Sequence, residues 1–166
     1  MYSLSIITDK DFRNTIEEET RLAKLDPYRV VLEIRETQTT QMLPEIQSAL
    51  LELRLKRFGL ALDAFGTGTA SMSHLKDIPF SILNIDKSVV QQAGSNQSAH
   101  AIMESSIELA RKLDMQVLAK GIDDEATWQL ARNMRCDYGC GDYLGGAMVQ
   151  TKFVEYINDP SRNSYN

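Results

Sequence analysis

The chain has few cysteines and histidines, the residues that zinc sites and many catalytic sites need. Of its 166 residues, only Cys136, Cys140, His74 and His100 are of these two types. The C-x-x-x-C spacing differs from that of zinc-binding pairs, and no second pair or nearby histidine completes a site. We therefore expect free, reduced thiols in a cytoplasmic protein, and we expect neither histidine to be catalytic.

Long apolar runs and basic stripes are also missing. No apolar run approaches the roughly 20 residues of a membrane-spanning helix, and no segment resembles a signal peptide. The formal net charge is −5, with 43% hydrophobic and 25% charged residues, as in an ordinary globular domain. Without a basic stripe the chain has little with which to neutralise phosphates along DNA. These absences predict no membrane span and no DNA partner.

What the sequence does contain is a regular alternation of apolar, strand-like segments and amphipathic, helix-like segments. The expected strands are residues 30–34, 60–64, 82–85, 115–119 and 143–149, with a further short apolar run at residues 4–7. The expected helices are residues 12–25, 41–57, 96 or 98 to 113, 123 or 124 to 134, and 152–157. Gly59 is expected to stop the second helix, and Asp86 to cap a helix that follows it.

This alternation predicts a mostly parallel sheet with right-handed crossovers. A complete eight-stranded barrel takes about 250 residues, and this chain has 166. We therefore expect the α/β class and a partial or modified TIM-type (β/α) barrel.

Two acidic residues follow neighbouring strand segments. In L-D-A-F-G-T-G, residues 62–68, Asp63 ends a buried strand just before a glycine-broken loop, and in I-L-N-I-D, residues 82–86, Asp86 ends the next strand. The carboxyl ends of parallel strands are where barrel enzymes keep their catalytic groups. A candidate site is expected at this end of the sheet.

Four segments resemble, in order, the motifs of one family. Residues 31–37, V-L-E-I-R-E-T, resemble an E-x-T-E strand, and residues 62–76 resemble D-D-F-G-T-G-Y-S-S-L-S-Y-L-K. Residues 118–123, L-A-K-G-I-D, resemble A-E-G-V-E, and residues 136–143, C-D-Y-G-C-G-D-Y, resemble C-D-Y-G-Q-G-Y-Y. Over residues 4–149 the chain thus resembles the EAL family, bacterial phosphodiesterases of cyclic di-GMP.

The resemblance implies a damaged catalytic site. In the family, carboxylates and an asparagine hold two divalent cations that activate a water for attack on a phosphodiester. Glu33 and Asp63 stand at retained ligand positions. The positions that differ are Ala64 for an aspartate, Asn84 for the catalytic lysine, Lys120 for a glutamate and Cys140 for a glutamine. No catalytic residue is expected to function.

Other family features are also expected to be missing. The strand that supplies the asparagine aligns with residues 4–7, which contain none, and the eponymous glutamate is expected upstream of Met1. We expect one EAL-like domain over residues 1–158 without the family's N-terminal strand and EAL motif, followed by a polar tail at residues 159–166.

Lys120 is the most informative of the differences. An ammonium among carboxylates repels Mg²⁺, so the sequence predicts an ion pair of Lys120 with Glu33 or Asp63 and no bound metal. In the alternative, Lys120 points into solvent. Glu33 and Asp63 themselves are expected to be residual acids kept for hydrogen bonding in the barrel mouth; in the alternative they are ligands of Mg²⁺ or Mn²⁺, if the site is active.

The function expected is that of a catalytically inactive EAL-like domain that acts by protein–protein interaction or regulation in cyclic di-GMP signalling. One alternative is a weak, metal-dependent cyclic di-GMP phosphodiesterase that needs a partner or a further N-terminal segment. A second alternative is a receptor that binds cyclic di-GMP without hydrolysing it.

Open strand edges predict association, either a homo-oligomer or a complex with a protein partner. The helix at residues 41–57 and the loop at residues 66–72 are the expected contact surfaces. Phe65 is expected to pack in the interior, and Trp128 to lie in the core or in an interface.

Overall fold

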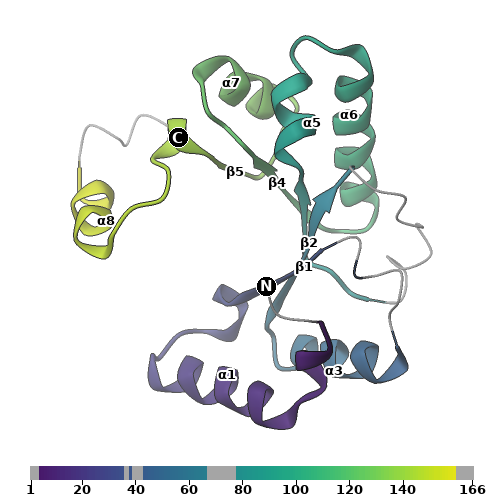
Figure 1. The fold of residues 1–166 in the computed structure, drawn as a ribbon, viewed down its shortest axis with the longest axis vertical. Helices are drawn as coiled ribbons and strands as arrows, with labels where there is room; N and C mark the ends of the chain where they lie inside the picture. Colours follow the sequence, from purple (N-terminus) through teal and green to yellow (C-terminus); the bar gives the residue numbers. More distant parts are fainter. Residues whose placement is uncertain (1–3, 36–37, 39–42, 67–77, 160–166) are drawn as a thin grey trace.

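A computed structural model of the chain describes residues 4–35, 38, 43–66 and 78–159. Five parallel strands form one sheet in the order β1-β2-β3-β4-β5 (Figure 1). They are β1 (Val31–Arg35), β2 (Gly59–Phe65), β3 (Ile82–Ile85), β4 (Gln116–Lys120) and β5 (Tyr138–Cys140). Each crossover adds the next strand on the same side, which is the winding of a barrel and not that of a doubly wound sheet. The predicted parallel α/β architecture is confirmed.

The helices pack around this sheet in two groups. Figure 1 shows α1 and α3 on the β1 side, α5, α6 and α7 on the β4 side, and α8 standing apart from both. Their bounds are α1 (Lys10–Leu22), α3 (Pro44–Leu55), α5 (Lys87–Gln92), α6 (Gln97–Lys112), α7 (Glu125–Asn133) and α8 (Gln150–Ile157), with 3₁₀ turns η1 (Leu4–Thr8), η2 (Pro27–Arg29) and η3 (Asp142–Leu144). None of the helices in these described parts is long and apolar enough to cross a bilayer.

Side-chain caps fix where four of the helices begin, and Asp9 caps α1 by accepting a hydrogen bond from the Asp11 amide. Asp86, Asn96 and Asp124 each accept hydrogen bonds from backbone amides in the first turn of α5, α6 and α7. Each such cap satisfies amide groups that have no partner within the helix, typically for about 1 kcal/mol. The sequence predicted Asp86 as a cap, and Asn96 and Asp124 are each one of the two positions that it left open for α6 and α7.

The core lies between the sheet and the helices that cover it. Its fully buried large side chains include Leu50, Leu53, Phe58, Leu60, Leu62, Ile78, Leu83, Ile85, Met103 and Ile122. Helix α3 buries Ile46, Ala49, Leu50 and Leu53. Two further leucines of the expected helix at residues 41–57 are exposed: Leu43 precedes α3, and Leu55 at its end is 86% exposed.

Two expected strands are not strands. Residues 4–7 belong to η1, where the Asp9 amide donates to the Ile6 carbonyl and the Arg13 guanidinium donates to the Ile7 carbonyl at 2.7 Å. Local turns and Arg13 thus satisfy the carbonyls that a neighbouring strand would have bonded.

The expected strand at residues 143–149 is replaced by η3 and a turn. Gly145 and Gly146 have φ of 123° and 57°, conformations that interrupt a strand. The strand lies earlier, at β5, where Leu118, Ala119 and Lys120 of β4 pair with residues 138–140.

Gly59 does not stop the helix before it. Arg57, with φ of 72°, takes the left-handed position after α3. Gly59 begins β2, and a Cβ there would lie 2.8 Å from Cγ2 of Val31, so the close approach of β1 requires glycine.

Candidate functional site

Polar side chains from four adjacent strands meet toward one end of the sheet. Nζ of Lys120, at the end of β4, donates to Oδ1 of Asp63 on β2 at 2.5 Å and to Oε2 of Glu33 on β1 at 3.0 Å. The predicted ion pair is therefore present, and the lysine bridges both carboxylates. The alternative in which Lys120 points into bulk solvent is wrong.

Asn84 of β3 completes this cluster. Its Nδ2 donates to Oε1 of Glu33 at 3.0 Å, so each carboxylate oxygen of Glu33 accepts one hydrogen bond. The bond spans strand β2, which lies between β1 and β3 and on which Ala61 is the register partner of Glu33. Asn84 is 1% exposed, and within the described chain its Oδ1 has no hydrogen-bond partner. The cluster is thus charge-paired but keeps one buried acceptor open.

We call Glu33, Asp63, Asn84 and Lys120 the strand-end cluster. Burial alone would raise the pKa of Asp63, but the hydrogen bond and charge of Lys120, the Ala64 amide and the Asn84 amide hold it below its ordinary value. Burial alone would lower the pKa of Lys120, but its hydrogen bonds to Asp63 and Glu33 and their charges raise it. Both groups are therefore charged at neutral pH and stabilise each other in that state.

The backbone conformation at Ala64 sets the direction in which the neighbouring Asp63 side chain points. The register between β2 and β3 shifts between Leu62 and Phe65, and within this bulge Ala64 has φ of 61°. An alanine in the left-handed region is strained, and bulges commonly re-aim a side chain beside a functional site. Phe65, as expected, packs against the core.

The two cysteines have different surroundings. Cys140 is exposed and is the register partner of Lys120; partial burial raises the pKa of its thiol, more than Lys120 lowers it. Burial raises the pKa of Cys136 to about 11. Both thiols are free, as predicted, and neither is poised as a thiolate at neutral pH.

The remaining predictions have simpler outcomes. His100 lies in α6 with Nδ1 3.1 Å from the Ala93 carbonyl, a structural contact. Trp128 packs against the core with Arg132 over its ring. His74 and most of the loop at residues 66–72 lie outside the described residues.

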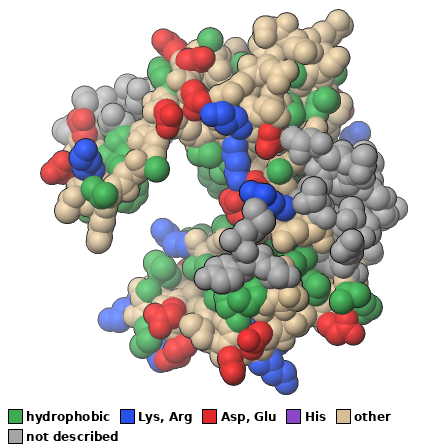
Figure 2. All heavy atoms as spheres, viewed as in Figure 1, with side chains coloured by type: hydrophobic (Ala, Val, Ile, Leu, Met, Phe, Trp, Pro, Cys, Tyr) green, Lys and Arg blue, Asp and Glu red, His purple; other side chains and the backbone are tan. Residues whose placement is uncertain are grey.

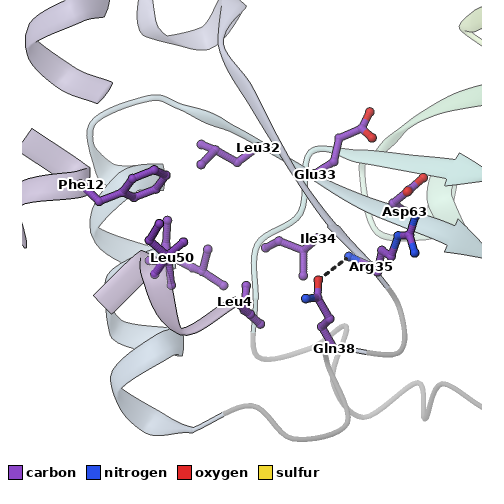
Figure 3. Close-up of a pocket in the computed structure, with 11 residues that line it drawn as sticks. Leu4, Phe12, Leu32, Glu33, Ile34, Arg35, Gln38, Leu50 and Asp63 are labelled. Carbon is purple, nitrogen blue, oxygen red and sulfur yellow. Dashed lines mark hydrogen bonds between the residues drawn. The ribbon is translucent and has the colours of Figure 1, made fainter. Parts of the chain in front are cut away.

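A pocket of about 500 Å³ opens beside the cluster, along β1 (Figure 3). Figure 3 shows Leu32 and Ile34 on one side of β1 with Phe12 and Leu50, and Glu33 and Asp63 on the other side. The rest of its lining is Leu4, Ile6, Ile7, Arg35 and Gln38. Sequence reasoning missed this pocket, because the apolar run at residues 4–7 was assigned to a strand. In the structure three of these residues line the pocket.

Sequence reasoning also missed that Asn84 holds Glu33. The signal was the polar residue inside the apolar strand I-L-N-I, which period-two alternation places on the same face as Asp86.

The cluster does not fit a divalent cation. Among the described residues no three His, Cys, Asp or Glu side chains converge as a metal-binding group. Asp63 and Glu33 both face the Lys120 ammonium, which lies where a cation shared between them would have to be. Mg²⁺ and Mn²⁺ need several oxygen ligands and are repelled by an ammonium at such distances.

Comparisons with known proteins place the chain in a family. The model of the EAL domain family matches residues 2–147, and the chain belongs to this family. Over 153 residues it is 28% identical to the cyclic di-GMP phosphodiesterase PA2567 of Pseudomonas aeruginosa, a match that covers 90% of this chain and 26% of that protein. It is 33% identical over 100 residues to the cyclic di-GMP phosphodiesterase PdeL of Escherichia coli, covering 60% of this chain and 28% of PdeL.

Solved EAL structures share the fold. The EAL enzyme Bd1971 in a cGMP-bound form superposes with a TM-score of 0.85 at 28% identity, covering 95% of this chain and 42% of that one. The EAL domain of Mycobacterium smegmatis DcpA gives a TM-score of 0.82 at 26% identity, covering 90% of this chain and 67% of that one. EAL domains are TIM-barrel-like, so the five-stranded sheet corresponds to part of such a barrel. The chain spans about a quarter of PA2567 and two thirds of the DcpA domain.

Proposed function

We propose that this chain is a catalytically inactive EAL domain that acts by protein–protein interaction or regulation in cyclic di-GMP signalling. One observation carries the proposal: Nζ of Lys120 lies 2.5 Å from Asp63 and 3.0 Å from Glu33, the two acids at retained ligand positions. One ammonium lies within bonding distance of both acids, so it neutralises one of their two charges and repels a divalent metal from the position between them.

The neighbouring substitutions support the same conclusion. Asn84, at the position of the family's catalytic lysine, carries an uncharged amide whose Nδ2 is engaged by Glu33. Ala64 has no ligand atom, and the Cys140 thiol, with its raised pKa, is a poor ligand for a hard cation. Two-metal hydrolysis needs one metal ion at the attacking oxygen and one at the leaving oxygen. These three side chains provide a suitable ligand for neither ion.

A second candidate function is a receptor that binds cyclic di-GMP without hydrolysing it. Arg35 favours it, because among the described residues its guanidinium has no ion-pair partner, and it lines the pocket beside the cluster. A free guanidinium binds a phosphate through paired hydrogen bonds. Relatives point the same way, since one solved form of Bd1971, 26% identical to this chain with a TM-score of 0.84, contains cAMP and cyclic di-GMP.

Incubation with cyclic di-GMP and either Mg²⁺ or Mn²⁺, followed by chromatography of the nucleotides, tests the inactive state. We expect the nucleotide to remain intact. Turnover that disappears in the Glu33→Ala variant would overturn the proposal, and turnover that persists in that variant would indicate a contaminating enzyme. Calorimetric titration of the same nucleotide without metal then separates the receptor from a domain that binds no nucleotide, and Arg35→Ala should abolish any heat of binding.

A charge reversal tests the role of Lys120 directly. Lys120→Glu replaces the internal cation by a third carboxylate beside Asp63, Glu33 and the open Oδ1 of Asn84. We expect this variant to gain thermal stability on addition of Mn²⁺ or Mg²⁺, while the wild type and the Lys120→Met control do not respond. A response of the wild type would show that Lys120 leaves the site open to metal.

A further inference from the structure

The segments that lead into the first two strands carry six of the chain's 18 basic residues. Residues 21–29 run from the last turn of α1 to β1, and residues 54–57 run from the last turn of α3 to β2, so both lie toward the amino-terminal ends of these strands. Figure 2 shows basic side chains that project at the left margin of the part of the molecule that carries α1. In a chain with a formal net charge of −5, this is a local excess of positive charge. The six are Arg21, Lys24, Arg29, Arg54, Lys56 and Arg57, and the same segments contain one acid, Asp26.

Tyr28 holds two of these arginines in place. This residue is 51% exposed, and the guanidinium carbons of Arg29 and Arg57 lie 5.6 Å and 5.9 Å from the centroid of its ring. A guanidinium that lies over an aromatic ring keeps N–H groups free to donate at its edge. The ring therefore orders two flexible side chains in advance, which lowers the entropy that binding an anion would cost.

The two arginines have little acidic compensation. Arg29 is exposed and has no ion pair within the described chain, and the Arg57 guanidinium reaches only Asp26, at 3.9 Å. Lys56, one residue before Arg57, is paired instead with Glu17 at 2.5 Å. The dipole of a helix does not account for Arg29, because η2 is a single 3₁₀ turn that leads into a strand. Both guanidiniums are thus available to an external anion.

A cavity beside this pair has room for an apolar side chain. It holds about 640 Å³ between α1, η2 and the end of α3, and its apolar lining is Leu25, Pro27 and Phe58. Leu25 is 48% exposed, so it lines the cavity and also faces solvent. Next to it in the chain, Lys24 is exposed as well. We call Lys24, Leu25, Tyr28, Arg29 and Arg57 the Tyr28 surface.

We propose that the Tyr28 surface binds an acidic segment of a protein partner. Carboxylates of the segment accept the paired hydrogen bonds that Arg29 and Arg57 can donate, and an apolar side chain of the segment enters the cavity. This inference rests on the proposed interaction role of the domain and names the kind of partner. It does not involve the strand-end cluster, which lies toward the other end of the sheet.

The charges around the surface favour a short acidic segment over a nucleic acid or a membrane. Asp26 lies beside Arg57, and Glu17 and Glu18 line the adjoining cavity. A phosphate backbone or an anionic bilayer presents a long, continuous array of negative charge, which these acids would repel. A peptide with two or three carboxylates can place its charges on the arginines and avoid the acids.

Only part of the contact surface expected from the sequence serves this role. The helix at residues 41–57 was expected to contact a neighbour, but α3 turns Ile46, Leu50 and Leu53 into its own core. The expected segment contributes to the Tyr28 surface through its last residue, Arg57.

Selection from a phage-displayed library of random peptides tests the kind of partner. We expect the peptides that bind the wild type to be rich in Asp and Glu, to share one apolar position and to bind more weakly as salt is raised. Enrichment of basic or purely apolar peptides, or of none at all, would overturn the proposal. It would also be overturned if phosphatidylserine vesicles or a DNA oligonucleotide bound more tightly than the peptides and lost that binding in Arg29→Glu.

Matched charge reversals locate the binding site. Arg29→Glu should weaken binding of the selected peptides by at least about tenfold, because it removes charge-assisted hydrogen bonds. Arg132→Glu is the control, since this arginine is also exposed and lies 5.8 Å from the centroid of an aromatic ring, that of Trp128 on α7. Equal effects of the two reversals would indicate long-range attraction only and would exclude the Tyr28 surface.

Two substitutions of Tyr28 test the role of its ring. Tyr28→Phe keeps the ring that orients both guanidiniums and should bind the selected peptides as the wild type does. Tyr28→Leu keeps only apolar bulk and should bind them more weakly. The same affinity in both variants would contradict the ordering of the arginines by the ring.

Hydrogen exchange of the wild type covers the case in which a variant does not fold. A bound peptide should slow amide exchange in residues 21–29 and 54–58 and leave α6 and α7 unchanged, and protection of a different surface would overturn the proposal. Peptide binding and nucleotide turnover are separate measurements. A failure of peptide binding therefore leaves the inactive state of the strand-end cluster standing, and turnover of cyclic di-GMP would count against that state alone.

Discussion

The strand-end cluster and helix α8 differ in how completely their side chains are partnered. In the cluster, Lys120 bridges Asp63 and Glu33, and Asn84 donates to Glu33. On α8, Val149, Phe153, Val154 and Ile157 are 48% to 65% exposed, and no residue of the helix is buried. The cluster thus keeps its polar groups paired within the chain, whereas α8 presents apolar side chains to solvent.

The largest expected effect contrasts two helices that were both predicted from apolar spacing. Leu53→Ala on α3 removes a side chain with no exposed surface, and we expect it to lower the free energy of unfolding by about 3 kcal/mol. Phe153→Ala on α8 should change the stability of the monomer by well under 1 kcal/mol, because the ring is half exposed. Urea unfolding at low protein concentration measures the free energy of unfolding of both variants. Equal losses of stability would contradict the expected difference between α3 and α8.

The next effect concerns the charge pairing itself. Lys120→Met leaves the partly buried Asp63 without its cation, and we expect a loss of about 2 kcal/mol, between the values for exposed and fully buried pairs. The double variant Lys120→Met with Asp63→Asn removes the unpaired charge and should recover part of the loss. If the double variant is as unstable as the sum of the two single variants, the pair contributes through packing and not through charge.

The pH dependence of this difference follows from the two pKa shifts. The pKa of Asp63 is lowered on folding, so its contribution is complete above about pH 4 and is lost as the pH falls through the folded pKa below that. The pKa of Lys120 is raised, so its contribution is complete below about pH 10 and is lost as the pH rises through the higher folded value. The stability difference between wild type and Lys120→Met should therefore be flat from about pH 5 to 9 and shrink on both sides. Urea unfolding of both proteins across this range measures it, and a difference that changes near neutral pH would implicate another group.

The smallest effect is expected at a pair of similar length on the surface. Nζ of Lys87 lies 3.0 Å from Asp123, like the Lys120–Glu33 contact, but both groups are open to solvent. Water and salt screen such a pair, so Lys87→Ala should leave the midpoint of thermal unfolding unchanged within error. A clear drop in the unfolding midpoint at low salt that vanishes at high salt would show that this ion pair contributes more to stability than its exposure to solvent suggests.

Much of the fold was predictable because the helix caps and apolar runs in the sequence match the helices and strands of the structure. Asp86, Asn96 and Asp124 cap helices where the sequence placed them, and residues 82–85 form a strand with the expected bounds. Of the site, the resemblance to the EAL motifs sufficed to predict that Glu33, Asp63 and Lys120 come together.

What could not be predicted depended on tertiary contacts. The run at residues 4–7 becomes a turn because the Arg13 guanidinium bonds its carbonyl, a contact that apolar periodicity does not encode. Phe153 and Leu53 both occupy apolar helical positions, and only the packing of neighbouring layers distinguishes a buried position from an exposed one.

The bulge at Ala64 bears on which side chains this position can accept. With φ of 61°, this position suits asparagine, aspartate or glycine better than the alanine that occupies it. The backbone therefore keeps a geometry that the present side chain does not use, at a cost of about 1 kcal/mol. Ala64→Asp would meet little steric resistance from the main chain, so the obstacle to rebuilding an acidic pair here is the charge balance around Lys120 and not the scaffold. The main chain at this position is therefore already suited to a carboxylate side chain.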